Sequence, residues 1–115
     1  MTHRVLVCGG RHFSNLRAVR VCLGGLIPKP THIIEGGAHG ADQLAHDWAM
    51  ANEIPCTTYT ADWGKHGRAA GPIRNQQMIE EGKPDLVVAF PGGTGTADMV
   101  RRAKAAGVRV IEVGK

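Results

Sequence analysis

Short apolar runs alternate with amphipathic segments along the whole chain. Most of these runs are rich in Val, Ile and Leu, as is typical of strands buried on both faces of a parallel sheet. They cover residues 5–8, 31–35, 56–60, 85–90 and 108–113. Between them, apolar residues recur at helical spacing. The helices that this spacing predicts cover residues 14–27, 41–49, 72–81 and 96–106.

This alternation predicts an α/β fold, a three-layer Rossmann-like open parallel sheet with helices on both faces. The first and fourth strands are the most apolar and should be central, whereas the more polar third strand should lie at an edge. The expected strand order is therefore 3-2-1-4-5, with a switch point between strands one and four. A length of 115 residues indicates a single domain over residues 1–115.

Local signals place the ends of the predicted helices. Ser14 is a plausible N-cap of the first helix, and Pro72 suits the first position of the third. Gly107 should end the fourth helix as a C-cap. Residues 61–71 then form a loop, and loops of this length are often functional.

Glycine-rich segments follow three of the predicted strands. The most informative is Phe-Pro-Gly-Gly-Thr-Gly-Thr at residues 90–96, and shorter copies lie at residues 36–42 and 9–11. Their backbone N–H groups, together with a helix N-terminus, can bind a phosphate. The alternative is an ordinary strand-to-helix turn. The candidate ligand-binding residues of these loops are Gly9, Gly10, Gly36, Gly37, Gly40, Pro91, Gly92, Gly93, Thr94, Gly95 and Thr96.

In the loop at residues 90–96 we expect Gly93→Val to abolish binding of the phosphorylated ligand, because a β-branched residue tolerates neither positive φ nor close approach. In the loop at residues 9–11, Arg11 follows the glycines directly, and its guanidinium can bind a phosphate through two hydrogen bonds. Arg74 and Asn75 belong to the first turn of a helix with few apolar residues, so they should face a cleft. Trp63 could cover a base or simply the sheet edge.

Acidic residues near the same rim complete the candidates. Asp42 and Asp62 are further ligand-binding candidates, although Asp42 and Asp98 could equally serve as helix-terminal groups. Glu35 ends the second strand, and we interpret it as a solvated strand end rather than a ribose-binding acid. Should a reaction occur, the candidate catalytic residues are Arg74, Asp98 and Asp42.

Standard cofactor motifs do not occur in the sequence. It contains neither the P-loop motif nor a Gly-x-Gly-x-x-Gly after the first strand, and no cofactor is predicted. His39, Asp42 and His46 match no standard ligand spacing, so we expect no metal.

The amino-acid composition limits the classes of partner that we expect. A formal net charge of +4 suits an anionic partner. The charges are dispersed and aromatic residues are scarce, so a nucleic-acid partner is not expected. Three scattered cysteines without a signal peptide indicate a cytoplasmic protein, and no apolar run is long enough to span a membrane.

Five motifs in order resemble the SLOG superfamily, and within it the small standalone YspA-like proteins. They are Val-Cys-Gly-Gly-Arg, Gly-Gly-Ala-His-Gly-Ala-Asp, Ala-Asp-Trp, Ala-Gly-Pro-Ile-Arg-Asn-Gln-Gln-Met and Ala-Phe-Pro-Gly-Gly-Thr-Gly-Thr-Ala-Asp-Met. The resemblance implies a Rossmann-like domain that binds nucleotides or nucleotide-derived molecules. Relatives include LOG-type phosphoribohydrolases, nucleotide sensor domains and the DNA-processing protein DprA. LOG-type relatives pair through helices beside the site, which implies a homodimer.

The resemblance also bears on catalysis. LOG-type enzymes carry Pro-Gly-Gly-x-Gly-Thr-x-x-Glu, and the position of that glutamate is Met99 here. A thioether cannot act as a general base, and a helix should turn the neighbouring Asp98 about 100° away. We therefore expect a domain that binds a phosphorylated nucleotide or nucleotide derivative. The alternatives are an N-glycosidic hydrolase acting on nucleoside monophosphates, and a DNA-binding or scaffold protein.

Overall fold

The computed structural model describes residues 2–114, so the two end residues of the predicted domain 1–115 lie outside it. Strands and helices alternate along this stretch, as the hydrophobic pattern predicts. The elements are β1 (Arg4–Cys8), α1 (Leu16–Gly24), β2 (His32–Glu35), α2 (Ala41–Ala51), β3 (Cys56–Thr58), α3 (Trp63–His66), the 3-10 helix η1 (Gly67–Ala69), α4 (Ala70–Gly82), β4 (Leu86–Ala89), α5 (Thr94–Ala105) and β5 (Arg109–Glu112).

The five strands form one parallel sheet in the order β3-β2-β1-β4-β5, which confirms the predicted topology. β1 lies between β2 and β4, and its register pairs Cys8 with Ala89 at the carboxyl ends of β1 and β4. Every residue of β4 is buried. The loops that leave β1 and β4 therefore start side by side at the switch point, where ligands bind in open α/β sheets.

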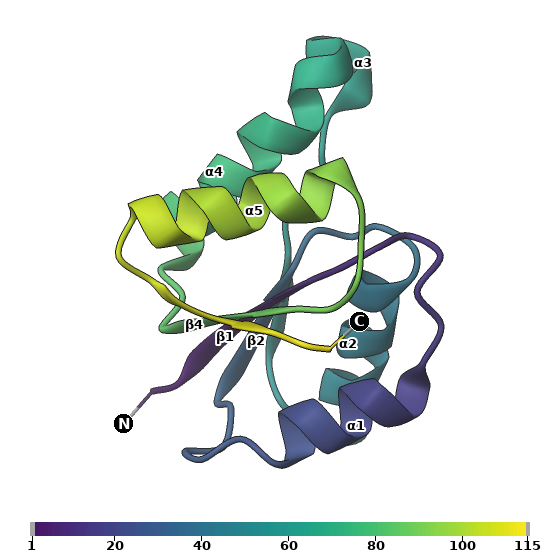
Figure 1. Cartoon of the computed structure of the whole chain (residues 1–115), viewed down its shortest axis with the longest axis vertical. Helices are drawn as coiled ribbons and strands as arrows, with labels where there is room; N and C mark the ends of the chain where they lie inside the picture. Colours follow the sequence, from purple (N-terminus) through teal and green to yellow (C-terminus); the bar gives the residue numbers. More distant parts are fainter. Residues whose placement is uncertain (1, 115) are drawn as a thin grey trace.

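Helices cover both faces of the sheet, as Figure 1 shows, with α1 and α2 on one side and α4 and α5 on the other. Two apolar clusters fill the spaces between the layers. One contains Val19, Leu23 and Trp48 from α1 and α2, and the other contains Met78 and Met99 from α4 and α5. Burial of these side chains positions the helix N-termini at the carboxyl edge of the sheet.

The first helix is shorter than predicted. It covers Leu16–Gly24, and the Asn15 side chain rather than that of Ser14 accepts the hydrogen bond from Ala18 N. Ile27, which continues the apolar spacing in sequence, is 95% exposed. Gly24 and Gly25 at the end of the apolar stripe explain the early stop, because glycine disfavours helix.

The predicted loop at residues 61–71 contains two short helical turns, α3 and η1. They lead directly into α4, which begins at Ala70, so Pro72 occupies the third helical position instead of the first. Proline is tolerated there because the N–H groups of a first helical turn have no partner within the helix. Among residues 2–114, no helix is both long and apolar enough to cross a membrane.

Candidate functional site

A large cavity lies at the carboxyl ends of the strands, bounded by all three glycine-rich loops and by α3 and α4. Its volume is about 1250 Å³. This is sufficient for a mononucleotide, because small-molecule sites in proteins usually measure about 300–1,000 Å³. The walls come from segments far apart in sequence, residues 8–13, 36–42, 60–78 and 91–101.

The N-terminus of α5 opens into this cavity. Gly93 is the N-cap, and among the described residues no side chain caps this helix. The first N–H groups of a helix have no partner within it, and the helix dipole makes them attractive to an anion. Thr94, Gly95 and Thr96 carry these groups and all line the cavity. The helix starts two residues earlier than predicted, which places Gly93 at its N-cap and Gly95 within its first turn.

Close backbone packing holds the first glycine loop (residues 9–11) against the third (residues 90–96). Gly10 N donates to the carbonyl of Pro91 at 2.9 Å. A Cβ on Gly92 would lie 2.6 Å from Gly10 N and would also collide with the Thr96 hydroxyl. Only glycine permits this approach without displacement of the backbone. The position of the third loop therefore depends on the first.

The second glycine loop (residues 36–42) contacts the first through Gly40. Its φ is +76°, and a Cβ there would lie 2.6 Å from the Arg11 carbonyl carbon. Ala41 N donates to the carbonyl of Gly10 at 3.2 Å. Gly40 supports the loop but does not line the cavity.

Arg74 and Asn75 connect the second loop to α5. Arg74 Nη1 donates to the Gly36 carbonyl at 2.6 Å, and its Nε donates to the Asn75 side chain at 3.1 Å. Asn75 Nδ2 in turn donates to the Gly95 carbonyl and to Asp98 Oδ2, at 3.2 and 3.0 Å. Both residues face the cavity, as the sequence predicted. This series of hydrogen bonds holds two glycine loops at a fixed separation.

Asp42 lies at the start of α2 and is 6% exposed. Its Oδ2 accepts hydrogen bonds from the N–H groups of Gly36 and Ala38, both at 3.2 Å. Burial raises the pKa of Asp42 to about 6, and the nearby Glu35 carboxylate adds to the rise, against the two backbone donors and Arg74. Asp42 thus organises the second loop and also lines the cavity.

Asp98 faces the cavity, whereas Met99 is fully buried in the apolar cluster between the sheet and α4. The expectation that Asp98 turns away from the site is therefore wrong. Burial alone would raise the pKa of Asp98, but hydrogen bonds from Asn75 and Arg102 and the charges of Arg101 and Arg102 lower it overall. Asp98 is a paired, ionised carboxylate beside the α5 N-terminus.

Most residues that the sequence proposed come together in this one cavity. The exceptions are Gly40 and Asp62, and the Asp62 side chain instead accepts the N–H of Lys65 at the start of α3. Sequence reasoning missed Arg68 and Arg101 as lining residues. The signal for Arg68 was the long segment after the third strand, but α3 and η1 decide which of its residues faces inward.

Two further lining residues differ in what they can do. Trp63 is 55% exposed and borders the opening of the cavity, where an aromatic face is accessible to a bound molecule. Cys8 lies at its floor, and burial raises the pKa of its thiol to about 12. Cys8 is therefore protonated and is no candidate nucleophile.

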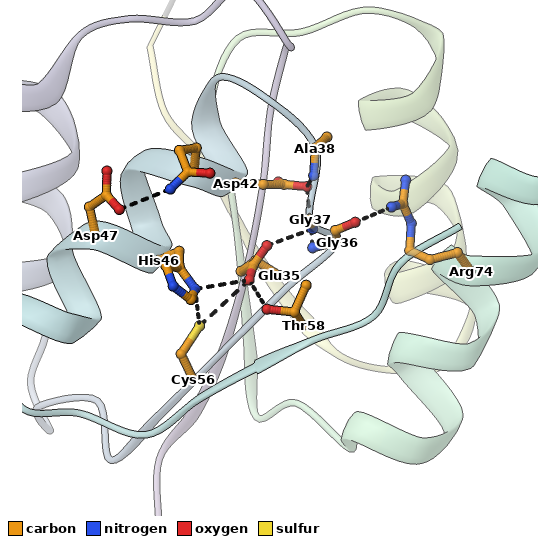
Figure 2. Close-up of polar contacts among 11 residues, drawn as sticks. Glu35, Gly36, Gly37, Ala38, Asp42, His46, Asp47, Cys56, Thr58 and Arg74 are labelled. Carbon is orange, nitrogen blue, oxygen red and sulfur yellow. Dashed lines mark hydrogen bonds and ion pairs between the residues drawn. The ribbon is translucent and has the colours of Figure 1, made fainter. Parts of the chain in front are cut away.

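Glu35 corrects another expectation, because it is buried and not a solvated strand end. Figure 2 shows its carboxylate surrounded by Cys56, Thr58 and His46, with Gly37 N donating to Oε1 at 2.6 Å. It does not line the cavity and lies behind the second loop. An acid at the end of a strand was visible in the sequence, but its partners on α2 and β3 were not.

Comparison with known proteins agrees with the motifs. The family model described as "YspA, cpYpsA-related SLOG family" matches residues 3–66. The chain is also similar to the Gene 61 protein of Mycobacterium phage D29, with 36% identity over 121 aligned residues that cover 96% of each chain. The matched motifs, the sheet order and the glycine-rich rim agree, and this protein belongs to the YspA, cpYpsA-related SLOG family.

Proposed function

We propose that this protein binds a phosphorylated nucleotide, or a nucleotide-derived molecule, in the cavity at the carboxyl edge of the sheet. The observation that supports this most strongly is the uncapped N-terminus of α5 beside Gly92, Gly93 and Gly95 on the wall of that cavity. A phosphate there would accept hydrogen bonds from backbone N–H groups and would benefit from the helix dipole.

The charges around the cavity support an anionic ligand. Four arginines line it against two carboxylates, and they are Arg11, Arg68, Arg74 and Arg101. Arg101 and Arg74 already have partners on the protein, Asp98 and the Gly36 carbonyl. Arg11 and Arg68 are exposed and form no ion pair within residues 2–114. They are the arginines free to contact a phosphate.

The remainder of the cavity suits the nucleoside part. Trp63 offers an aromatic face to a base at the opening. Asp42 and Asn75 are polar groups on the wall that can contact a ribose. The family placement supports a nucleotide-related ligand at this edge of the fold.

Thermal unfolding with a panel of mononucleotides, cyclic nucleotides and ADP-ribose-type compounds tests the proposal. A ligand at a hundredfold excess over its Kd stabilises the native state by about 2.7 kcal/mol. At about 4 °C per kcal/mol for a domain of this size, the midpoint should rise by about 10 °C. If no member of the panel moves the midpoint, the small-molecule proposal fails, and a DNA-binding or scaffold role becomes the better hypothesis.

A second candidate function is N-glycosidic hydrolysis of a nucleoside monophosphate. The observation in its favour is that two acids in one cavity have pKa values shifted in opposite directions, Asp42 upward and Asp98 downward. Such pairs can divide the acid and base roles in catalysis. Chromatographic detection of free base from nucleoside monophosphates tests it. Release should disappear in Asp42→Asn and Asp98→Asn but persist in a variant outside the cavity, such as Arg20→Ala.

We also propose that the protein is a homodimer that pairs through α4. Ile73 on this helix is 45% exposed and belongs to neither apolar cluster, although it lies beside the cavity residues Pro72 and Arg74. A second copy would cover it and would complete the sparse apolar face of the helix.

A further inference from the structure

Glu35, His46 and Cys56 bring a carboxylate oxygen, an imidazole nitrogen and a sulfur within 4.8 Å of one another. They come from three elements, β2, α2 and β3, so no ligand spacing in the sequence reveals them. Figure 2 shows the three side chains pointing toward one another, away from Arg74. We propose that this cluster, referred to below as the Glu35 cluster, binds a divalent late transition metal of the zinc type.

The distances among the three ligand atoms fit a tetrahedral ion. Bond lengths of about 2.3 Å to sulfur, 2.05 Å to nitrogen and 2.1 Å to oxygen put tetrahedral ligand atoms about 3.6 Å (S–N), 3.6 Å (S–O) and 3.4 Å (N–O) apart. The corresponding distances are 3.5 Å for Cys56 Sγ to His46 Nδ1, 3.7 Å for Cys56 Sγ to Glu35 Oε2 and 3.4 Å for His46 Nδ1 to Glu35 Oε2. The three ligand atoms are therefore already spaced as a tetrahedral ion requires.

Neighbouring groups hold the carboxylate in position, as is usual around metal ligands. The Thr58 hydroxyl donates to Glu35 Oε2, and Gly37 N donates to Oε1 at 2.6 Å. Glu35 is 1% exposed, so its orientation is fixed by these donors and not by solvent. The carboxylate is presented to the other two ligand atoms before any ion arrives.

The chemistry of the donors selects the class of ion. A thiolate, an imidazole and a carboxylate suit zinc and its neighbours, whereas magnesium and calcium prefer oxygen ligands alone. The thiol proton leaves to solvent as the sulfur–metal bond forms. Thiolate and carboxylate then balance a divalent charge. The His46 side chain is 37% exposed, which gives the ion a route from solvent and leaves a fourth position for water.

Cobalt(II) is the most direct probe, because a bond between thiolate and cobalt gives charge-transfer absorption in the near ultraviolet. Protein treated with a chelator should bind one equivalent of cobalt with this band, and zinc should displace it. Cys56→Ser should abolish the band. Cys22→Ser is the matched control, since Cys22 is a half-buried thiol on α1 outside the cluster, and it should retain the band.

Two further variants separate metal binding from folding. His46→Gln changes a partly exposed side chain and should weaken zinc binding about a hundredfold or more, while Thr58→Val should weaken it about ten- to a hundredfold and keep the band. Circular dichroism verifies that each variant is folded. Absence of the band in the wild-type protein, or its loss in Cys22→Ser but not in Cys56→Ser, would overturn the proposal and leave a network of hydrogen bonds.

Discussion

Replacement of Gly93 by valine separates an anion site from an ordinary turn. The sequence predicts that Gly93→Val abolishes binding of a phosphorylated ligand, in part because Gly93 should have a positive φ. Its φ is −101°, however, and a Cβ there meets no protein atom within 4 Å. The expected reason of positive φ is therefore wrong. The open space in front of Gly93 is where a phosphate on the α5 N-terminus would lie, so the valine should obstruct the ligand and not the fold.

The magnitudes follow from this geometry. Gly93→Val loses only the preference of an N-cap for glycine, which costs less than about 1 kcal/mol of unfolding free energy. Binding should weaken much more, because each lost hydrogen bond to a charged phosphate costs about 1.5–3 kcal/mol, or about ten- to a hundredfold in Kd. Gly92→Ala should instead lower the free energy of unfolding, because the new Cβ would collide with Gly10 N. Overpacking of this kind costs about 1–3 kcal/mol.

Calorimetric titration with the best nucleotide of the panel and thermal unfolding should be run on both variants. Gly24→Val is the control, because Gly24 also has open space around it but lies outside the cavity. We expect Gly93→Val to keep its melting temperature within about 4 °C and to lose affinity. A variant that binds as tightly as the wild type would refute the placement of a phosphate at this helix end.

Three other predictions concern charge, pH and assembly. Arg11→Ala and Arg68→Ala should each weaken nucleotide binding by about 1.5–3 kcal/mol without a change in melting temperature. Arg20→Ala on α1 is the control. Unchanged affinity in both Arg11→Ala and Arg68→Ala would remove these two arginines from the site. Asp42 has a folded pKa of about 6 against an ordinary value of 3.8, so the folded state binds more protons between these values. Its contribution to stability should fall by about 2 kcal/mol as pH rises from 4 to 7. Parallel stability curves for the wild type and Asp42→Asn in chemical denaturation would contradict this. Light scattering at high micromolar concentration should give the mass of a dimer that Ile73→Glu converts to a monomer, and a monomeric wild type would reject the pairing through α4.

The sheet could be predicted because its information is local. Runs of valine, isoleucine and leucine mark every strand except the more polar β3, and right-handed connections leave few ways to order the strands. Helix boundaries were less predictable. Leu26 and Ile27 continue the spacing of α1, but two glycines end the helix before them. Likewise, Pro72 resembles a helix start although α4 begins two residues before it.

The candidate site could be predicted where it follows strand ends, and not where it depends on packing between elements. Gly92 and Arg74 were recognisable because they follow predictable elements. By contrast, Glu35 is buried by partners on β3 and α2, and Asp98 is directed to the cavity by Asn75 on α4. These contacts join residues more than ten positions apart, which no periodicity in one segment can reveal.

Separate calorimetric titrations of the protein with a nucleoside and with the monophosphate of that nucleoside test the central claim most directly. The α5 N-terminus, Arg11 and Arg68 all act on charge, so the monophosphate should bind at least about tenfold more tightly. The difference in affinity between the monophosphate and the nucleoside should shrink as the salt concentration is raised, because salt screens the charges of exposed arginines. Equal affinities for nucleoside and monophosphate, unchanged by salt, would contradict the phosphate site at the glycine-rich rim.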